Sequence, residues 1–117
     1  MRENRAVPSI ALDLDGTIDE APEFFRVLSE CWPGKVYVIT YRNDRAKAEQ
    51  DVAKCGIRCD EVVVVSSFAQ KAAEIASRNI SVYVDDQDEI LMHIPESVTV
   101  LKIRNGGNYD FVGWRTD

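Results

Sequence analysis

Histidine and cysteine are scarce in this sequence of 117 residues, which contains one histidine and three cysteines. Cys31, Cys55 and Cys59 are odd in number and irregularly spaced, which does not suit a disulfide framework. A structural zinc site needs four clustered cysteine or histidine ligands, and His93 lies far along the chain from all three cysteines. We therefore expect reduced thiols in a cytoplasmic protein.

Long apolar runs and basic clusters are also missing. No run approaches the roughly 20 apolar residues of a membrane-spanning helix. No apolar segment like that of a signal peptide follows the charged residues 1–5. The chain has 14 Lys and Arg against 20 Asp and Glu, a formal net charge of −6, and the basic residues do not cluster. We expect neither membrane insertion nor nucleic-acid binding, whereas an anionic substrate remains compatible with a bound Mg²⁺.

What the sequence does contain is the composition of a globular protein, 45% hydrophobic and 29% charged, with a length that fits one domain over residues 1–117. Five short apolar runs recur along it. Continuous runs of this kind are typical of strands buried on both faces of a parallel sheet. The runs cover residues 10–14, 36–39, 62–65, 82–84 and 98–103.

Amphipathic segments separate the apolar runs. The first is expected to form a helix that begins at Pro22 and buries Phe24, Leu28 and Cys31. The remaining helices are expected over 43–54, from residue 66 or 67 onward, and over 88–93. Strands alternating with helices predict a three-layer, doubly wound (Rossmann-like) open α/β sheet of about five parallel strands.

Polar side chains stand where these elements meet one edge of the predicted sheet. Because the carboxyl ends of parallel strands share an edge, where ligands bind in doubly wound folds, we expect them to surround one site. They are Asp13 and Asp15 after the first strand, Thr40 after the second, Lys71 early in the third helix, and Asp85 and Asp86 after the fourth strand.

These residue types suit phosphoryl transfer. An aspartate can attack phosphorus to form an aspartyl-phosphate. A second aspartate can protonate the leaving group and later deprotonate water, since the turn at Gly16 lets the two side chains diverge. A divalent cation on the downstream acidic pair would relieve the repulsion between carboxylates and phosphate. A lysine, a threonine hydroxyl and the backbone N–H groups of Gly16 and Thr17 would bind phosphoryl oxygens.

Four segments resemble the motifs of the haloacid dehalogenase (HAD) superfamily, in the superfamily's order. Residues 10–17, Ile-Ala-Leu-Asp-Leu-Asp-Gly-Thr, resemble motif I, and residues 36–40, a strand ending in threonine, resemble motif II. Lys71 resembles the lysine of motif III, and residues 82–86, which end in two aspartates, resemble the acidic motif IV. The resemblance covers residues 10–103 and implies a HAD-like fold.

The resemblance also implies roles for these residues. Asp13 would be the nucleophile and a magnesium ligand, and Asp15 the general acid/base, binding the metal through its backbone carbonyl. Thr40 and Lys71 would hold the phosphoryl group. Asp85 would be the main metal ligand of motif IV.

The resemblance leaves the roles of Asp86 and Glu89 less sharply defined. The residue at position 15 indicates the type of reaction. Asp86 would help to bind the metal, either directly or through water, and Glu89 would belong to the outer shell of the site. In the superfamily, phosphatases carry aspartate at the position of Asp15, whereas dehalogenases and phosphonatases do not. The resemblance therefore implies a magnesium-dependent phosphatase.

The intervals between the motifs are too short for a cap domain. Residues 18–35 can hold a small hairpin-like flap and one helix, and residues 65–71 hold no insertion. A capless site is open, so water must be excluded by the substrate or by a neighbouring subunit of an oligomer. In the superfamily, open sites often accompany bulky or macromolecular phosphorylated substrates.

Three other functions share part of these features. The same residues suit phosphotransfer to an acceptor other than water, and a catalytically idle member would serve as a binding module. A response-regulator receiver domain also has an acidic pocket with a threonine and a lysine. Its order differs, because here Thr40 precedes Lys71 and an acidic pair ends the fourth strand.

Several residues near the motifs carry a less specific signal. Asp19 and Glu20 are expected to be solvated, with an influence on substrate choice as the alternative. Arg42 is placed for a substrate contact, and Asn43 for either a substrate contact or a helix N-cap, with Asp44 as the alternative N-cap. An aromatic segment is expected to cover the core, with a place at the site rim or in an oligomer contact as alternatives. It comprises Tyr109, Phe111 and Trp114.

Overall fold

The computed structural model describes residues 7–105 and contains a five-stranded sheet with the order β3-β2-β1-β4-β5. Each of its four strand pairs is parallel. The strands are β1 (Ser9–Leu12), β2 (Val36–Tyr41), β3 (Glu61–Val65), β4 (Ile80–Asp85) and β5 (Thr99–Lys102). The chain winds outward from β1 to β3 and then crosses to the other side of β1, so the topological switch point lies between β1 and β4.

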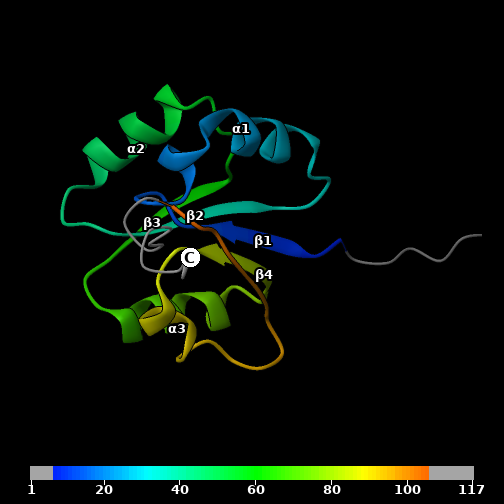
Figure 1. Cartoon of the computed structure of the whole chain (residues 1–117), viewed down its shortest axis with the longest axis vertical. Helices are drawn as coiled ribbons and strands as arrows, with labels where there is room; N and C mark the ends of the chain where they lie inside the picture. Colours follow the sequence, from blue (N-terminus) through cyan, green and yellow to red (C-terminus); the bar gives the residue numbers. More distant parts are fainter. Residues whose placement is uncertain (1–6, 106–117) are drawn as a thin grey trace, which may run out of the picture.

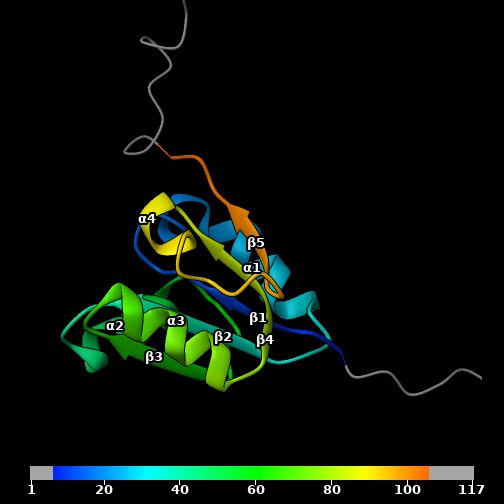
Figure 2. The ribbon, with the colours of Figure 1, turned by 90° about the horizontal axis from the view of Figure 1, so that it is seen from below.

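Helices cover both faces of this sheet, which confirms the predicted doubly wound α/β fold. Helices α1 and α2 lie on one side and α3 on the other, so the molecule has three layers (Figure 1). Figure 2, seen from the α3 side, shows β5 at one edge of the sheet. The helices are α1 (Pro22–Cys31), α2 (Arg45–Lys54), α3 (Phe68–Ser77) and α4 (Asp88–Leu91), with a short 3₁₀ helix η1 (Ile18–Glu20) before α1.

The helices begin where local sequence signals favour it. Pro22 occupies the first turn of α1. Asp44 caps α2 by accepting the Lys47 N–H at 3.0 Å, so Asn43 is not the N-cap. Ser67 caps α3 in the same way, accepting the Gln70 N–H at 3.0 Å. This cap fixes the start of α3 and thereby the position of its second turn.

The core is divided by the sheet into two clusters, because successive strand residues point to opposite faces. On the α1 side, Leu12 and Val38 are fully buried. On the α3 side, Ile39, Ile75 and Tyr83 are fully buried. Both clusters extend to the carboxyl ends of β1, β2 and β4. The residues that follow these strands therefore lie directly next to the packed core.

The predicted buried face of α1 was wrong for Phe24 and Cys31, whereas Leu28 is partly buried against the cluster on the α1 side, as predicted. Phe25 and Ser29 are buried, whereas Phe24 is 61% exposed and Cys31 is exposed. The helix is rotated because the Phe25 ring packs into the cluster on the α1 side. The hydrophobic pattern did not indicate this face because Ser29, which is buried together with Phe25, is polar.

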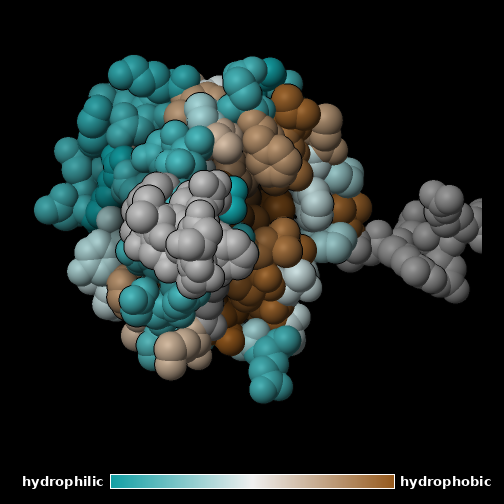
Figure 3. Space-filling view, in the orientation of Figure 1, coloured by the Kyte–Doolittle hydropathy of each residue, from teal (hydrophilic) through white to brown (hydrophobic). Residues whose placement is uncertain are grey.

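The predicted burial of the fifth strand on both faces was also wrong. In β5, Thr99, Leu101 and Lys102 are exposed. On the α1 side, β5 and α1 border an apolar groove of about 500 Å³ that includes Phe24, Leu101 and Ile103. The groove belongs to the brown surface in Figure 3.

Residues 18–35 form η1 and α1 and contain no hairpin-like flap. Ile18 in η1 is fully buried, so this segment packs against the core instead of projecting over the site. No domain is inserted anywhere between residues 7 and 105, as predicted for a capless chain. None of the helices in that range is long and apolar enough to cross a membrane. The aromatic residues Tyr109, Phe111 and Trp114 lie outside the described residues.

Candidate active site

Asp13 lies at the carboxyl end of β1, beside β4. Its backbone N–H donates to the Val84 carbonyl at 3.0 Å, which continues the pairing of the two strands one residue beyond β1. Its side chain is buried, with the residue 5% exposed. The Thr17 hydroxyl, which is also buried, donates to the Asp13 carboxylate at 3.4 Å. Asp13 is therefore held by the central strands and by the turn that follows it.

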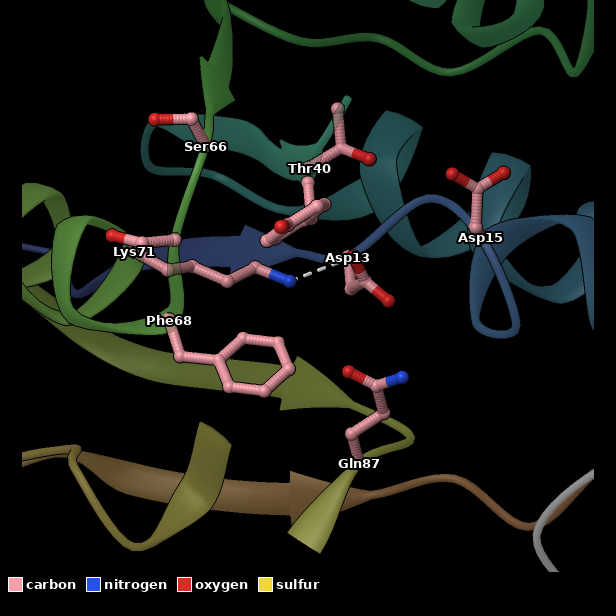
Figure 4. Close-up of a pocket in the computed structure, with 9 residues that line it drawn as sticks. Asp13, Asp15, Thr40, Ser66, Phe68, Lys71 and Gln87 are labelled. Atoms are coloured by element: carbon pink, nitrogen blue, oxygen red, sulfur yellow. Dashed lines mark hydrogen bonds and ion pairs between the residues drawn. The ribbon is translucent and has the colours of Figure 1, made fainter. Parts of the chain in front are cut away.

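Lys71 projects from the second turn of α3 and forms two buried ion pairs. Its Nζ lies 2.8 Å from Asp13 Oδ1 and 2.9 Å from Asp85 Oδ2, and its contact with Asp13 is drawn in Figure 4. Burial works to lower the pKa of Lys71, but Asp13 and Asp85 outweigh it and the pKa is raised. Lys71 therefore stays an ammonium in the interior.

Asp13, Asp85 and Asp86 form an acidic cluster in which one oxygen of each lies within 4.8 Å of the others. Burial raises the pKa of Asp13 to about 7, Lys71 opposes this, and Asp85 adds to it. Lys71 pairs with two of these three acidic residues, Asp13 and Asp85, and Asp86 lies half-buried beside them. Carboxylate oxygens are the donors preferred by hard divalent cations such as Mg²⁺, so the residues present fit such an ion.

Asp85 is fixed by several hydrogen bonds at the end of β4. Its Oδ1 accepts the backbone N–H groups of Asp86 at 2.6 Å and Gln87 at 3.0 Å. Its Oδ2 accepts the hydroxyl of the buried Tyr83 as well as the Lys71 ammonium. Asp85 is therefore preorganised, and Tyr83 is a supporting residue that the sequence analysis missed.

Thr40 contributes a buried hydroxyl to the same site. The residue is fully buried, and its Oγ1 has no hydrogen-bond partner among the described residues. Together with Asp13 and Lys71 it lines a cavity of about 460 Å³, the site cavity. A buried hydroxyl without a partner costs about 1–3 kcal/mol. Thr40 thus presents an unsatisfied polar group to whatever binds in the cavity.

Asp15 points away from Asp13, as the sequence analysis expected from the turn at Gly16. Figure 4 shows the two carboxylates directed to different parts of the cavity. Arg42 binds Asp15 through both oxygens, at 2.9 Å and 2.7 Å, and donates to Asp51 at 2.7 Å. Arg42, predicted to contact substrate, therefore holds Asp15 in this structure.

Gly16 allows the turn between the two aspartates. Its φ of +82° lies in the left-handed region, and a Cβ there would overlap Asp86 Oδ2. Its N–H donates to Asp19 Oδ1 at 2.8 Å, and the Thr17 N–H donates to the Leu14 carbonyl at 3.3 Å. Both N–H groups are thus bonded within the turn, and their role in phosphate binding stays a prediction.

Asn105 joins the site from the far end of the described chain. Its amide donates to the Gly16 carbonyl at 2.7 Å and to Asp86 at 3.1 Å. The sequence analysis missed this residue, and the signal available was its place just beyond the fifth strand, at the same edge of the sheet. Glu89 and His93 are exposed. The remaining residues that line the site cavity are Tyr41, Ser66, Ser67, Phe68 and Gln87.

The structure brings the predicted residues of all four motifs to one edge of the sheet. Asp13, Lys71 and Asp85 are in direct contact, and Thr40 and Asp15 line the cavity beside them. This arrangement offers a buried carboxylate, a fixed positive charge and a candidate cation site within one cavity. Comparison of the chain with protein-family models and with curated proteins finds no match.

Proposed function

We propose that this chain is a phosphomonoesterase of the HAD superfamily that uses Asp13 as nucleophile, Asp15 as general acid/base and Mg²⁺ as cofactor. The proposal is supported by the contacts of Asp13 with Lys71 and by the acidic cluster beside them. We also propose that the protein acts in the cytoplasm, supported by the three cysteines, which are all free.

The reaction would proceed in two displacements on one phosphorus atom. A carboxylate oxygen of Asp13 bonds to phosphorus while the ester P–O bond breaks, and Asp15 gives its proton to the leaving oxygen. Water then attacks the phosphorus of the aspartyl-phosphate, Asp15 takes the water proton, and Asp13 is released with inorganic phosphate. Lys71 and Thr40 would hold the phosphoryl oxygens. A divalent cation bound by Asp13, Asp85 and Asp86 would neutralise negative charge on the phosphate.

The observation that carries the proposal is the unpartnered, buried Thr40 hydroxyl in the same cavity as the Asp13–Lys71 pair. A phosphate would accept from this hydroxyl and from the ammonium while Asp13 approaches phosphorus. The test is phosphate release from a panel of phosphate esters that includes an aryl phosphate, with Mg²⁺ and with a chelator. We expect release that depends on Mg²⁺. A panel on which the purified protein releases no phosphate, with or without metal, would overturn the proposal.

One observation favours a second function, a module that binds phosphate esters without hydrolysing them. Asp15 is bound through both oxygens by Arg42, so it must exchange partners before it can donate a proton. Saturable binding of inorganic phosphate without turnover of any ester would support this alternative. Turnover that requires an added alcohol acceptor would instead indicate a phosphotransferase.

Cation binding is expected to weaken as the pH falls, because Asp13 must lose its proton to act as a ligand. Its pKa of about 7 predicts that the affinity for Mg²⁺ or Mn²⁺ falls about tenfold per pH unit below about pH 7. Calorimetric titration with Mn²⁺ at pH 5.5, 6.5 and 7.5 measures this. The Asp13→Asn variant is the control and should show a shallower pH dependence. An affinity that is constant over this range in the unmodified protein would contradict the assignment of Asp13 as a ligand.

A further inference from the structure

Two aromatic rings lie at the site cavity without belonging to the hydrophobic core. Tyr41 ends β2 and is 55% exposed, and Phe68 begins α3 and is half-buried. Their ring centroids are 5.8 Å apart and their planes are inclined by 60°. Both residues line the cavity that contains Asp13 and Lys71. Ligand pockets are typically lined by aromatic and apolar side chains with a few polar groups among them.

The cavity also offers polar groups beside these rings. Figure 4 shows Phe68 and Gln87 extending into the cavity below Lys71, with Ser66 on the other side. The amide of Gln87 can both donate and accept hydrogen bonds. An aromatic surface next to an amide suits a planar ring that carries its own donors and acceptors, more than it suits a sugar or an alkyl chain.

The dimensions fit a ligand larger than phosphate alone. The cavity of about 460 Å³ lies within the range of about 300–1,000 Å³ typical of small-molecule sites. The phosphoryl group would occupy the part beside Asp13, Thr40 and Lys71, which leaves the part beside Tyr41 and Phe68 for the alcohol portion of the ester.

Resting on the proposed phosphatase function, we propose that the substrate is a nucleoside monophosphate, whose base stacks on the exposed ring of Tyr41, meets the Phe68 ring at its edge and bonds to Gln87. This assigns the two aromatic residues a role in substrate selection. Stacking of a base on an aromatic side chain tolerates different bases, so the site would select for the presence of a base more than for its identity.

A comparison of two esters that differ only in the base tests the proposal. Uridine 5′-monophosphate and ribose 5-phosphate share the phosphate and the ribose, so the ratio of their kcat/KM values isolates the contribution of the ring. We expect a ratio of about 10 or more in the unmodified protein.

Variants of the two aromatic residues then test whether they contact the base of the substrate. Tyr41→Leu and Phe68→Leu are each expected to reduce the ratio toward one. Phe24→Leu is the matched control, because Phe24 is 61% exposed but lies in the apolar groove away from the site cavity, and it should leave the ratio unchanged. Melting temperatures of all three variants check that each protein is folded.

The outcomes separate the substrate class from the reaction. A ratio near one in an active protein would overturn the nucleotide proposal while leaving the phosphatase standing. If no ester is hydrolysed, calorimetric binding of the same two esters decides. Tighter binding of the nucleotide, lost in Tyr41→Leu, would support the ring site although the phosphatase proposal fails, and equal binding would overturn both.

Discussion

Replacement of Asp13 by asparagine is expected to lower phosphate release by about 10⁴-fold or more. The carboxamide cannot form the covalent bond to phosphorus on which the proposed reaction depends. Lys71 also pairs with Asp85, so we expect it to keep its place in this variant and the loss to arise from the nucleophile itself. Steady-state assays with Mg²⁺ and an aryl phosphate measure the effect. Asp88→Asn is the control, since the Asp88 side chain is 73% exposed, and it should retain turnover.

The same substitution is expected to stabilise the metal-free protein at neutral pH. The folded pKa of Asp13, about 7, lies above its ordinary value of 3.8, so the fold favours the protonated form. Its contribution to stability is present below about pH 4 and is lost as the pH rises toward 7. At pH 7.5, Asp13→Asn removes this penalty, and each 1 kcal/mol gained raises the melting temperature by about 4–8 °C. A variant that retains full turnover, or that melts below the unmodified protein at pH 7.5 without metal, would contradict this account.

Replacement of Lys71 by methionine is expected to have the largest effect on stability. The change leaves the cluster of Asp13, Asp85 and Asp86 without its buried ammonium, while the methionine side chain keeps much of the volume of lysine. Removing one partner of a buried ion pair typically costs about 3–5 kcal/mol. Loss of the phosphoryl-binding charge should also lower turnover by about 10³-fold. Urea unfolding at pH 7.5, with and without Mg²⁺, measures the first effect.

Mg²⁺ is expected to recover part of the stability lost in Lys71→Met, because the ion neutralises the same carboxylates. Lys54→Met is the control, since Lys54 is exposed near the end of α2, and its unfolding free energy should change by less than about 0.5 kcal/mol. A Lys71→Met variant as stable as Lys54→Met in the absence of metal would show that the buried charges are not arranged as described.

The sequence predicted the sheet and the convergence of the motif residues because both depend on local patterns. Continuous apolar runs mark strands in a parallel sheet, and parallel strands bring their carboxyl ends to one edge. Asp13 and Asp85 could therefore be placed near each other without knowledge of any contact. Lys71 was placed by its position early in the predicted third helix and by the resemblance to motif III, and the cap at Ser67 now fixes where α3 begins.

The supporting residues could not be predicted because long-range packing decides their contacts. Asn105 bonds to Gly16 across 89 positions of the chain, and Arg42 binds Asp15 across 27. Tyr41 and Phe68 meet only because β2 ends beside the start of α3. The exposure of β5 is not explained by its edge position alone, since β3 lies at the opposite edge of the sheet and is largely buried.

The most direct test of the central claim is the mass of the Asp15→Asn variant after incubation with Mg²⁺ and an aryl phosphate. Without the general base, hydrolysis of the intermediate should be slower than its formation. The account predicts that intact mass spectrometry shows the addition of one phosphoryl group, that peptide mapping places it on Asp13, and that Asp13→Asn prevents it. A phosphoryl group on another residue, or an unmodified variant that has cleaved one equivalent of ester, would contradict the assignment of Asp13 as the nucleophile.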